Sequence, residues 1–168
     1  MQLTICIPYF DDADNLDKLL KSIHENELNK TEYEIIICGN DPENKVQKLA
    51  LKWSEKIPVS LILTPEKSSA SINLNKGLQV ARGDIFCRID SHCILDKEYL
   101  KQGLSLFREK YPKFSAIGPS VEVIGQIGNS FSMTIAKLYM SPFLLGPSKF
   151  KRSFFYKNYS GLTDSIFL

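Results

Sequence analysis

Residues 84–93 read DIFCRIDSHC, an apolar run that ends in three polar side chains. The first half is apolar enough to form a buried strand, and it runs directly into Asp90, Ser91 and His92. In open α/β sheets ligands bind beyond the carboxyl ends of the strands, so we expect these side chains to face a pocket. Asp and His are suitable ligands for a divalent metal ion that also holds phosphate oxygens. Taken alone, the tripeptide is more often an ordinary turn or helix cap.

The length and composition are typical of one globular domain. The chain has 168 residues, 43% hydrophobic and 24% charged, so we expect a single domain over residues 1–168. A net charge of +2 argues against a nucleic-acid partner. No stretch is typical of a secretion signal or of a bilayer span. The cysteines show no CxxC spacing and lie mostly in apolar runs, which predicts a reduced, cytoplasmic protein; they are Cys6, Cys38, Cys87 and Cys93.

Strands and helices alternate along the chain. Apolar runs predict strands at residues 3–7, 33–38, 59–63 and 84–89, and apolar residues at helical spacing predict a helix after each of them. Alternation at this spacing indicates βαβ units, hence an α/β fold with a mostly parallel sheet between helices. The expected inner faces of the helices are Leu16, Leu19, Leu20 and Ile23; Val46, Leu49, Ala50 and Trp53; Leu74, Leu78 and Ala81; and Leu100, Gly103, Leu104 and Phe107.

Boundary residues predict where several of these elements begin and end. Pro8 is expected to end the first strand, and Asp12 or Asp14 to cap the first helix. Gly83 is expected to terminate the third helix, and Asp96 to cap the fourth.

The last third of the chain changes character. A strand is predicted over residues 115–124 and a weaker helix over 129–140. Residues 149–159 then interleave lysine and arginine with aromatic side chains. A solvated basic loop is the commoner explanation of such a segment. The sharper one is a mobile flap over an anionic ligand, with possible peripheral membrane contact.

Polar groups follow three of the predicted strands and should meet at one edge of the sheet. They occupy residues 8–12 after the first strand, 39–41 after the second and 90–92 after the fourth. A nucleoside diphosphate needs an aromatic surface for its base, acceptors for its ribose and a counter-ion for its pyrophosphate. Aromatic and carboxylate groups beside a metal site would supply all of these.

Several motifs resemble the inverting family 2 glycosyltransferases, which have the GT-A fold. Residues 8–12 (PYFDD) resemble their opening motif, 33–37 (YEIII) the strand leading to their uridine-contacting acid, and 75–84 (NKGLQVARGD) the segment before their DxD motif. Residues 88–92 (RIDSH) are similar to the variant found in bacterial exopolysaccharide enzymes of the succinoglycan type. Residues 141–151 and 159–167 resemble later stretches of that subgroup, so the resemblance covers nearly the whole chain.

The resemblance implies a metal-assisted transfer, with inversion, from a nucleotide-sugar donor such as a UDP-sugar to a saccharide or lipid-linked acceptor in cell-surface polysaccharide synthesis. It places the reaction at the inner membrane face and implies a divalent cation, Mn²⁺ or Mg²⁺, held by Asp90 and His92. Asp90 is the implied catalytic residue. The implied nucleotide-binding residues are Pro8, Tyr9, Phe10, Asp12, Asn40, Asp41, Asn75 and Ser91.

The sequence departs from the family pattern in three places. His92 replaces the second carboxylate of DxD, although imidazole is still a competent ligand. The second strand ends without an acid at or next to Gly39, so base recognition falls to Asn40 or Asp41. The family's general base and further acceptor-binding elements come well after DxD, and residues 1–168 hold little of that part. Asp164 matches a subgroup position, but no role is assigned to it.

Three other classes of protein share features with this sequence. A receiver domain also has an acid pair after its first strand, but its phosphoacceptor Asp should follow residue 63, where Thr64 and Pro65 stand. A dinucleotide-dependent oxidoreductase should show GxGxxG after the first strand, and this sequence does not. A non-catalytic nucleotide-sugar-binding remnant or regulatory domain would have the same N-terminal sequence, so it stays open.

Overall fold

The computed structural model describes residues 2–65, 68–113, 115–118, 128–140 and 165–167. The chain divides into two compact units, one of Met1–Ile117 with Asp164–Leu168 and one of Gly118–Thr163. The first unit contains the sheet and four of the helices. The described part of the second unit contains helix α5 (Ser130–Met140), which confirms the helix predicted over residues 129–140.

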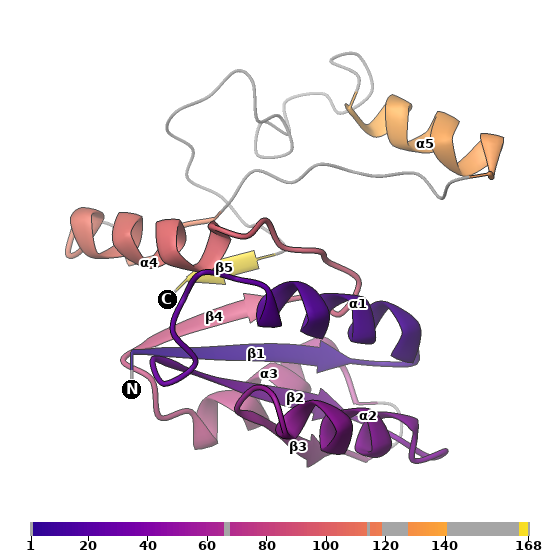
Figure 1. Cartoon of the computed structure of the whole chain (residues 1–168), viewed down its shortest axis with the longest axis horizontal. Helices are drawn as coiled ribbons and strands as arrows, with labels where there is room; N and C mark the ends of the chain where they lie inside the picture. The colour runs from indigo at the N-terminus through magenta and orange to yellow at the C-terminus, as the bar shows by residue number, and fades with distance from the viewer. Residues whose placement is uncertain (1, 66–67, 114, 119–127, 141–164, 168) are drawn as a thin grey trace. The chain divides into compact units, whose positions relative to one another are not determined.

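The first unit is built on a five-stranded sheet of order β3-β2-β1-β4-β5 (Figure 1). The strands β1 (Leu3–Tyr9), β2 (Tyr33–Gly39), β3 (Val59–Leu63) and β4 (Ile85–Ile89) are parallel to one another. The short strand β5 (Ser165–Phe167) pairs antiparallel with β4 and was not predicted. The predicted strands and the mostly parallel sheet are therefore confirmed.

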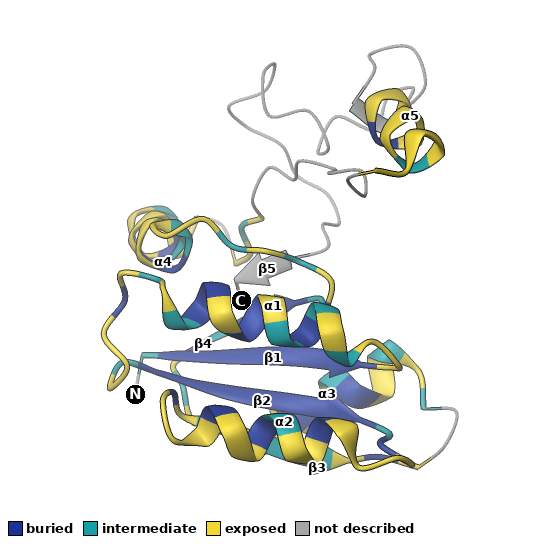
Figure 2. Ribbon diagram, turned by 45° about the vertical axis from the view of Figure 1, so that its right-hand side comes forward, coloured by how far each residue is buried: buried dark blue, intermediate teal, exposed yellow. Residues whose placement is uncertain are grey.

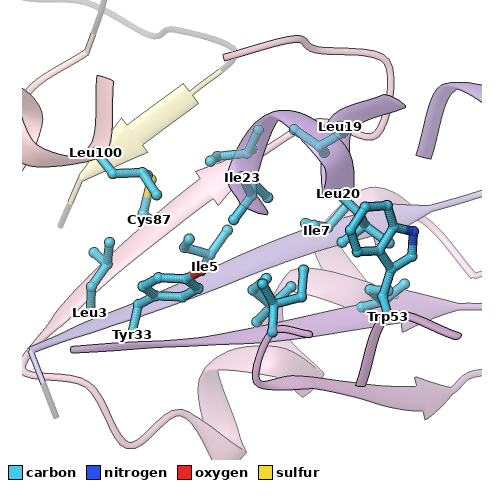
Figure 3. Packing of buried hydrophobic residues seen from close by; sticks show 14 of the residues in the cluster. Leu3, Ile5, Ile7, Leu19, Leu20, Ile23, Tyr33, Trp53, Cys87 and Leu100 are labelled. Carbon is cyan, nitrogen blue, oxygen red and sulfur yellow. The ribbon is translucent and has the colours of Figure 1, made fainter. Parts of the chain in front are cut away.

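Helices cover both faces of the sheet and bury its central strands completely (Figure 2). One face packs against α1 (Ala13–His24), α2 (Lys45–Ser54) and α4 (Tyr99–Lys110), and the other face against α3 (Ala70–Val80). Figure 3 shows Ile5 and Ile7 of β1 among the α1 side chains Leu20 and Ile23, with Trp53 of α2 at one end of the cluster. The result is a three-layer α/β/α unit.

Some element boundaries differ from those predicted. Strand β1 continues through Pro8 to Tyr9, because beyond Cys6 it pairs with β2 but no longer with β4, and a strand with a free side tolerates a missing N–H. Asp12 caps α1 as predicted, accepting the Asn15 N–H at 3.0 Å. Asp96 does not cap α4; it forms the turn before the helix, which begins at Tyr99.

Helix α3 uses a different inner face from the one predicted. Leu78 is 55% exposed and Ala81 lies beyond the helix end, whereas Asn73 and Gly77 are buried against the sheet. A Cβ added at Gly77 would stand 2.4 Å from Cys6 Sγ, so the helix approaches β1 only because residue 77 has no side chain. Leu74 packs beside this contact, as expected. Close packing, and not apolar spacing, selects this face.

Gly83 has a packing role and does not terminate α3. The helix ends at Val80 with an extended residue after it, and a Cβ at Gly83 would lie 2.5 Å from the Thr4 backbone nitrogen. At this point Glu34 of β2 accepts hydrogen bonds from Thr4 Oγ1 at 2.8 Å and from the Arg82 backbone N–H at 2.6 Å. The Arg82 guanidinium adds an ion pair to Glu34 at 2.8 Å. This network ties β1, β2 and the α3–β4 turn together at the amino-terminal edge of the sheet.

Burial raises the pKa of the Glu34 carboxyl, but the hydrogen bonds from Arg82 and Thr4 and the Arg82 charge outweigh burial and hold that pKa below its ordinary value. Glu34 is therefore ionised at neutral pH although it is only 4% exposed. Its role at this edge is structural.

Two sequence predictions fall largely outside the described residues. These are the strand over 115–124, of which residues 119–124 are not described, and the basic segment 149–159. None of the helices in the described ranges combines the length and the apolar character that a bilayer span requires.

Candidate functional site

The carboxyl ends of β1, β2 and β4 meet at one edge of the sheet, as parallel pairing requires (Figure 1). Tyr9 and Gly39 are register partners at the ends of β1 and β2. A Cβ at Gly39 would stand 2.3 Å from the Tyr9 carbonyl oxygen, so glycine is required for the two strand ends to lie this close. The sequence prediction that these strand ends share one edge is confirmed.

The two aromatic residues at the end of β1 have opposite exposures. Tyr9 is 3% exposed and belongs to the core, whereas Phe10 is 53% exposed. Burial, together with the charges of Asp11 and Asp41, raises the pKa of the Tyr9 phenol, so it stays protonated. Of these two neighbours, Phe10 is the ring that could stack on a base.

The segment after β2 is held by its own hydrogen bonds. Asp41 is buried, and its Oδ2 accepts the Gln47 N–H of α2 at 2.8 Å. Asn40 is half-buried, and the hydrogen bonds described here do not engage its side chain. The Asp41 carboxylate therefore already has a structural partner, which leaves Asn40 as the better candidate of the two for direct contact with a ligand.

Asn73 is a buried polar residue at this edge that sequence reasoning missed. Its side-chain nitrogen donates to the Tyr9 carbonyl oxygen at 3.3 Å, and the residue is completely buried. Its Oδ1 has no hydrogen-bond partner among the described residues. The sequence does contain a signal for this: Asn73 lies four positions before Gly77, so both residues fall on the same face of the helix. Asn73 thus holds the end of β1 against α3.

Asp90 lies at the end of β4 in a bidentate ion pair. Arg88 donates from Nε to Oδ1 at 3.0 Å and from Nη2 to Oδ2 at 3.1 Å. The Asp90 side chain is 15% exposed and that of Arg88 31%. The pair forms because residues two apart on a strand point to the same face.

Ser91 and His92 are the central residues of a turn closed by the Cys93 N–H, which donates to the Asp90 carbonyl at 3.0 Å. Ser91 is buried and His92 is exposed. The chain beyond the turn is fastened to the end of α1, where Leu95 N–H donates to Ser22 Oγ at 3.1 Å and the Asn26 amide donates to the Asp96 carbonyl at 2.8 Å. The turn is therefore positioned from both sides.

The donor atoms at this turn fit a divalent cation that takes its other ligands from phosphate and water. Asp90 supplies carboxylate oxygens and the exposed His92 supplies an imidazole, both of which Mn²⁺ accepts. Within the described ranges, no three His, Cys, Asp or Glu side chains come together as a metal cluster. Among the described residues, Asp90 and His92 are the two candidate ligands, and phosphate oxygens would have to complete such a site.

The other proposed nucleotide-binding residues are placed less directly. Pro8 is buried in β1. Asp12 is exposed, but both of its carboxylate oxygens bond to Asn15. Asn75 lies on the exposed side of α3, away from the face that carries Asn73. For these residues, contact with a ligand stays a prediction.

A separate cavity of about 320 Å³ lies at the opposite, amino-terminal edge of the sheet. Its walls come from the start of β1, the approach to β2 and helix α4, and include Gln2, Glu32, Lys101 and Arg108. Arg108 is hydrogen-bonded to Gln2, and Lys101 pairs with Glu27 at 3.1 Å. Of these described side chains, only Lys101 is paired with an opposite charge, because Gln2 is a neutral amide, and the cavity walls include none of the candidate site residues.

Residues 4–161 match the family described as Glycosyl transferase family 2. The chain belongs to this family. A relative from Methanococcus voltae, dolichyl N-acetyl-alpha-D-glucosaminyl phosphate 3-beta-D-2,3-diacetamido-2,3-dideoxy-beta-D-glucuronosyltransferase, is 27% identical over 161 residues. That alignment covers 91% of this chain and 49% of the relative, so this family 2 chain spans about half the length of the curated relative it matches.

Solved structures confirm the GT-A fold. TarS from S. aureus superposes with a TM-score of 0.62 at 21% identity, over 77% of this chain and 37% of TarS, and it has also been solved with UDP-GlcNAc. The mannosyltransferase PcManGT from Pyrobaculum calidifontis, solved with GDP-Man and Mn²⁺, has a TM-score of 0.62 at 18% identity, over 72% of this chain and 35% of that enzyme. The predicted family and fold are thereby confirmed.

Proposed function

We propose that this chain is the donor-binding part of an inverting glycosyltransferase that moves a sugar from a nucleotide diphosphate to an acceptor in cell-surface polysaccharide synthesis. The observation that carries the proposal is the Asp90-Ser91-His92 turn at the end of β4, beside the ends of β1 and β2. Family membership and the GT-A fold support it. The donor complexes of TarS and PcManGT support a nucleotide-sugar as the ligand class.

Each residue in the proposal has a role that follows from its placement. Phe10, half-exposed at the end of β1, would stack on the base, and Asn40 would offer it hydrogen bonds. Asp90 and His92 would hold a divalent cation, which when bound neutralises charge on the departing diphosphate. The hydrogen bond from the Cys93 N–H to the Asp90 carbonyl would hold the backbone of the turn in place.

Inverting transfer needs one further group, a base that removes the proton from the acceptor hydroxyl as that oxygen attacks the anomeric carbon. The bond from the anomeric carbon to the diphosphate oxygen breaks in the same step. We assign the base to none of the described residues, and Asp164 lies outside them. We propose that acceptor binding depends on sequence beyond the part described here.

The acceptor and location are inferred from sequence. Basic and aromatic residues over 149–159 suit a lipid-linked diphosphate or an anionic membrane surface at the cytoplasmic face. Replacing Lys149, Lys151 and Arg152 together by Gln should weaken binding to vesicles rich in anionic lipid and flatten its salt dependence. Unchanged affinity and salt dependence would mean an ordinary solvated segment.

Calorimetry with UDP and GDP, with Mn²⁺ or with a chelator, tests donor binding directly. We expect tighter binding with the metal, because a cation held at Asp90 adds positive charge beside the diphosphate oxygens. Asp90→Ala should remove the metal dependence. Asp84→Ala is the matched control, since Asp84 is an exposed carboxylate just before the other end of β4.

Equal affinity with and without Mn²⁺ would contradict the metal-assisted mechanism, and failure of both nucleotides to bind would contradict the proposed function. Binding without transfer to any saccharide or lipid-linked acceptor would instead favour a nucleotide-sugar-binding remnant.

A further inference from the structure

The carboxylate proposed to bind the cation is already neutralised by the protein. Arg88 engages both Asp90 oxygens with good geometry, at 3.0 and 3.1 Å. Bidentate pairs of this kind are among the strongest side-chain hydrogen bonds. Because the Asp90 carboxylate is only 15% exposed, water screens this pair less than it screens a surface pair.

A divalent cation approaching Asp90 therefore meets a positive charge. With Arg88 in place, the pair carries no net charge. Each carboxylate oxygen keeps a lone pair, so geometry alone does not prevent shared coordination. Repulsion between a guanidinium and a dication a few ångströms apart does oppose it. In the donor-free protein, a cation that binds Asp90 must then either break the ion pair with Arg88 or be repelled by the Arg88 charge.

A diphosphate changes this balance because it offers new anionic oxygens to both cations. A guanidinium binds phosphate in the same bidentate way as carboxylate. If Arg88 turns to a phosphate, Asp90 becomes available to the metal, and the metal gains phosphate ligands as well.

We propose that Arg88 makes cation binding at Asp90 conditional on the diphosphate, so that metal and nucleotide bind with positive cooperativity. This inference rests on the proposed function, because it takes the ligand to be a nucleoside diphosphate. Arg88 is a positioning residue for Asp90 in the donor-free protein and a phosphate contact when the donor is bound. Linkage requires the nucleotide to raise metal affinity by the same factor as the metal raises nucleotide affinity.

The test measures free Mn²⁺ by electron paramagnetic resonance during titration of the metal-free protein, with no nucleotide present. Arg88→Gln should bind Mn²⁺ alone roughly tenfold more tightly than the unaltered chain, within the usual range of coupling between sites. The cooperativity between Mn²⁺ and UDP, or GDP, should shrink in the same variant. Arg88→Lys should be intermediate, because an ammonium keeps the charge but not the paired geometry.

Arg108→Gln is the control, since it makes the same change on an exposed arginine of α4. Mn²⁺ affinity that is equal or weaker in Arg88→Gln would overturn the inference. Thermal melts identify a variant that fails to fold, and Arg88→Lys then decides: affinity equal to that of the unaltered chain overturns the inference. Failure of the unaltered chain to bind either nucleotide would overturn the proposed function instead, so the two failures are distinguishable.

Discussion

Replacing Glu34 should destabilise the fold far more than replacing an exposed carboxylate. Glu34→Ala removes a side chain that is 6% exposed and leaves two donors without their acceptor, the buried Thr4 hydroxyl and the partly buried Arg82 N–H. Each orphaned donor costs about 1–3 kcal/mol. The Arg82 side chain is 72% exposed and can return to water, so its loss adds little. The expected total is about 3–5 kcal/mol of unfolding free energy.

Glu34→Gln removes the negative charge of this side chain but keeps its size and shape. The amide keeps one oxygen for these donors but carries no charge, so we expect a smaller loss of about 2 kcal/mol. Urea titration followed by circular dichroism measures both variants. Glu43→Gln is the control, because Glu43 pairs with Lys45 at 2.6 Å on a surface where both side chains are more than half exposed. That variant should change stability by less than about 1 kcal/mol.

The same network predicts a pH dependence. The pKa of Glu34 in the folded protein is held below its ordinary value of 4.5, so its contribution to stability is fully present above about pH 4.5. That contribution is lost as pH falls through the lower, folded pKa. The stability gap between the unaltered chain and Glu34→Gln should therefore narrow below pH 4.5. If the difference in unfolding free energy does not narrow as pH falls below 4.5, or if Glu34→Gln is no less stable than Glu43→Gln, the network's assigned role is refuted.

Three further changes test the packing. Gly77→Ala should cost about 1–3 kcal/mol, because its Cβ would lie 2.4 Å from the Cys6 sulfur, and adding Cys6→Ala should recover part of that loss in a denaturant titration. Gly39→Ala should weaken UDP or GDP binding in calorimetry, because its Cβ would lie 2.3 Å from the carbonyl oxygen that ends β1. Unchanged binding would mean that this strand end is not part of the binding site. Trp53→Phe should cost about 2 kcal/mol by losing the 2.6 Å hydrogen bond to Asp17, and NMR titration should show the depressed pKa of that carboxyl rising toward its ordinary value.

Much of the fold could be predicted because its signals are local. Uninterrupted apolar runs specified the buried parallel strands, and helical spacing specified the inner faces of α1, α2 and α4. The inner face of α3 could not be predicted in this way. Its contact depends on the absence of a side chain at Gly77, and hydrophobic spacing contains no such information. Strand β5 is too short to give a periodic signal.

The position of the candidate site at this edge of the sheet was predictable, but the burial and the pairing of its residues were not. Parallel topology brought the ends of β1, β2 and β4 together as expected. The sequence could not show that Tyr9 is buried while Phe10 is exposed, since both are aromatic and adjacent. The sequence analysis also identified Asp90 as a candidate without identifying its ion-pair partner. The pairing with Arg88 follows from strand alternation and could have been read from their spacing.

The antiparallel pairing of β5 with β4 joins Cys87 to Phe167 and Ile89 to Ser165, residues far apart in sequence. Without β5, the outer side of β4 would present unpaired backbone groups at the sheet's margin, a template on which a second chain can add a strand. Ile89, the residue before Asp90, would then lose its pairing with Ser165. Residues 165–167 thus occupy the outer side of the strand that leads to Asp90, where a second chain could otherwise add a strand.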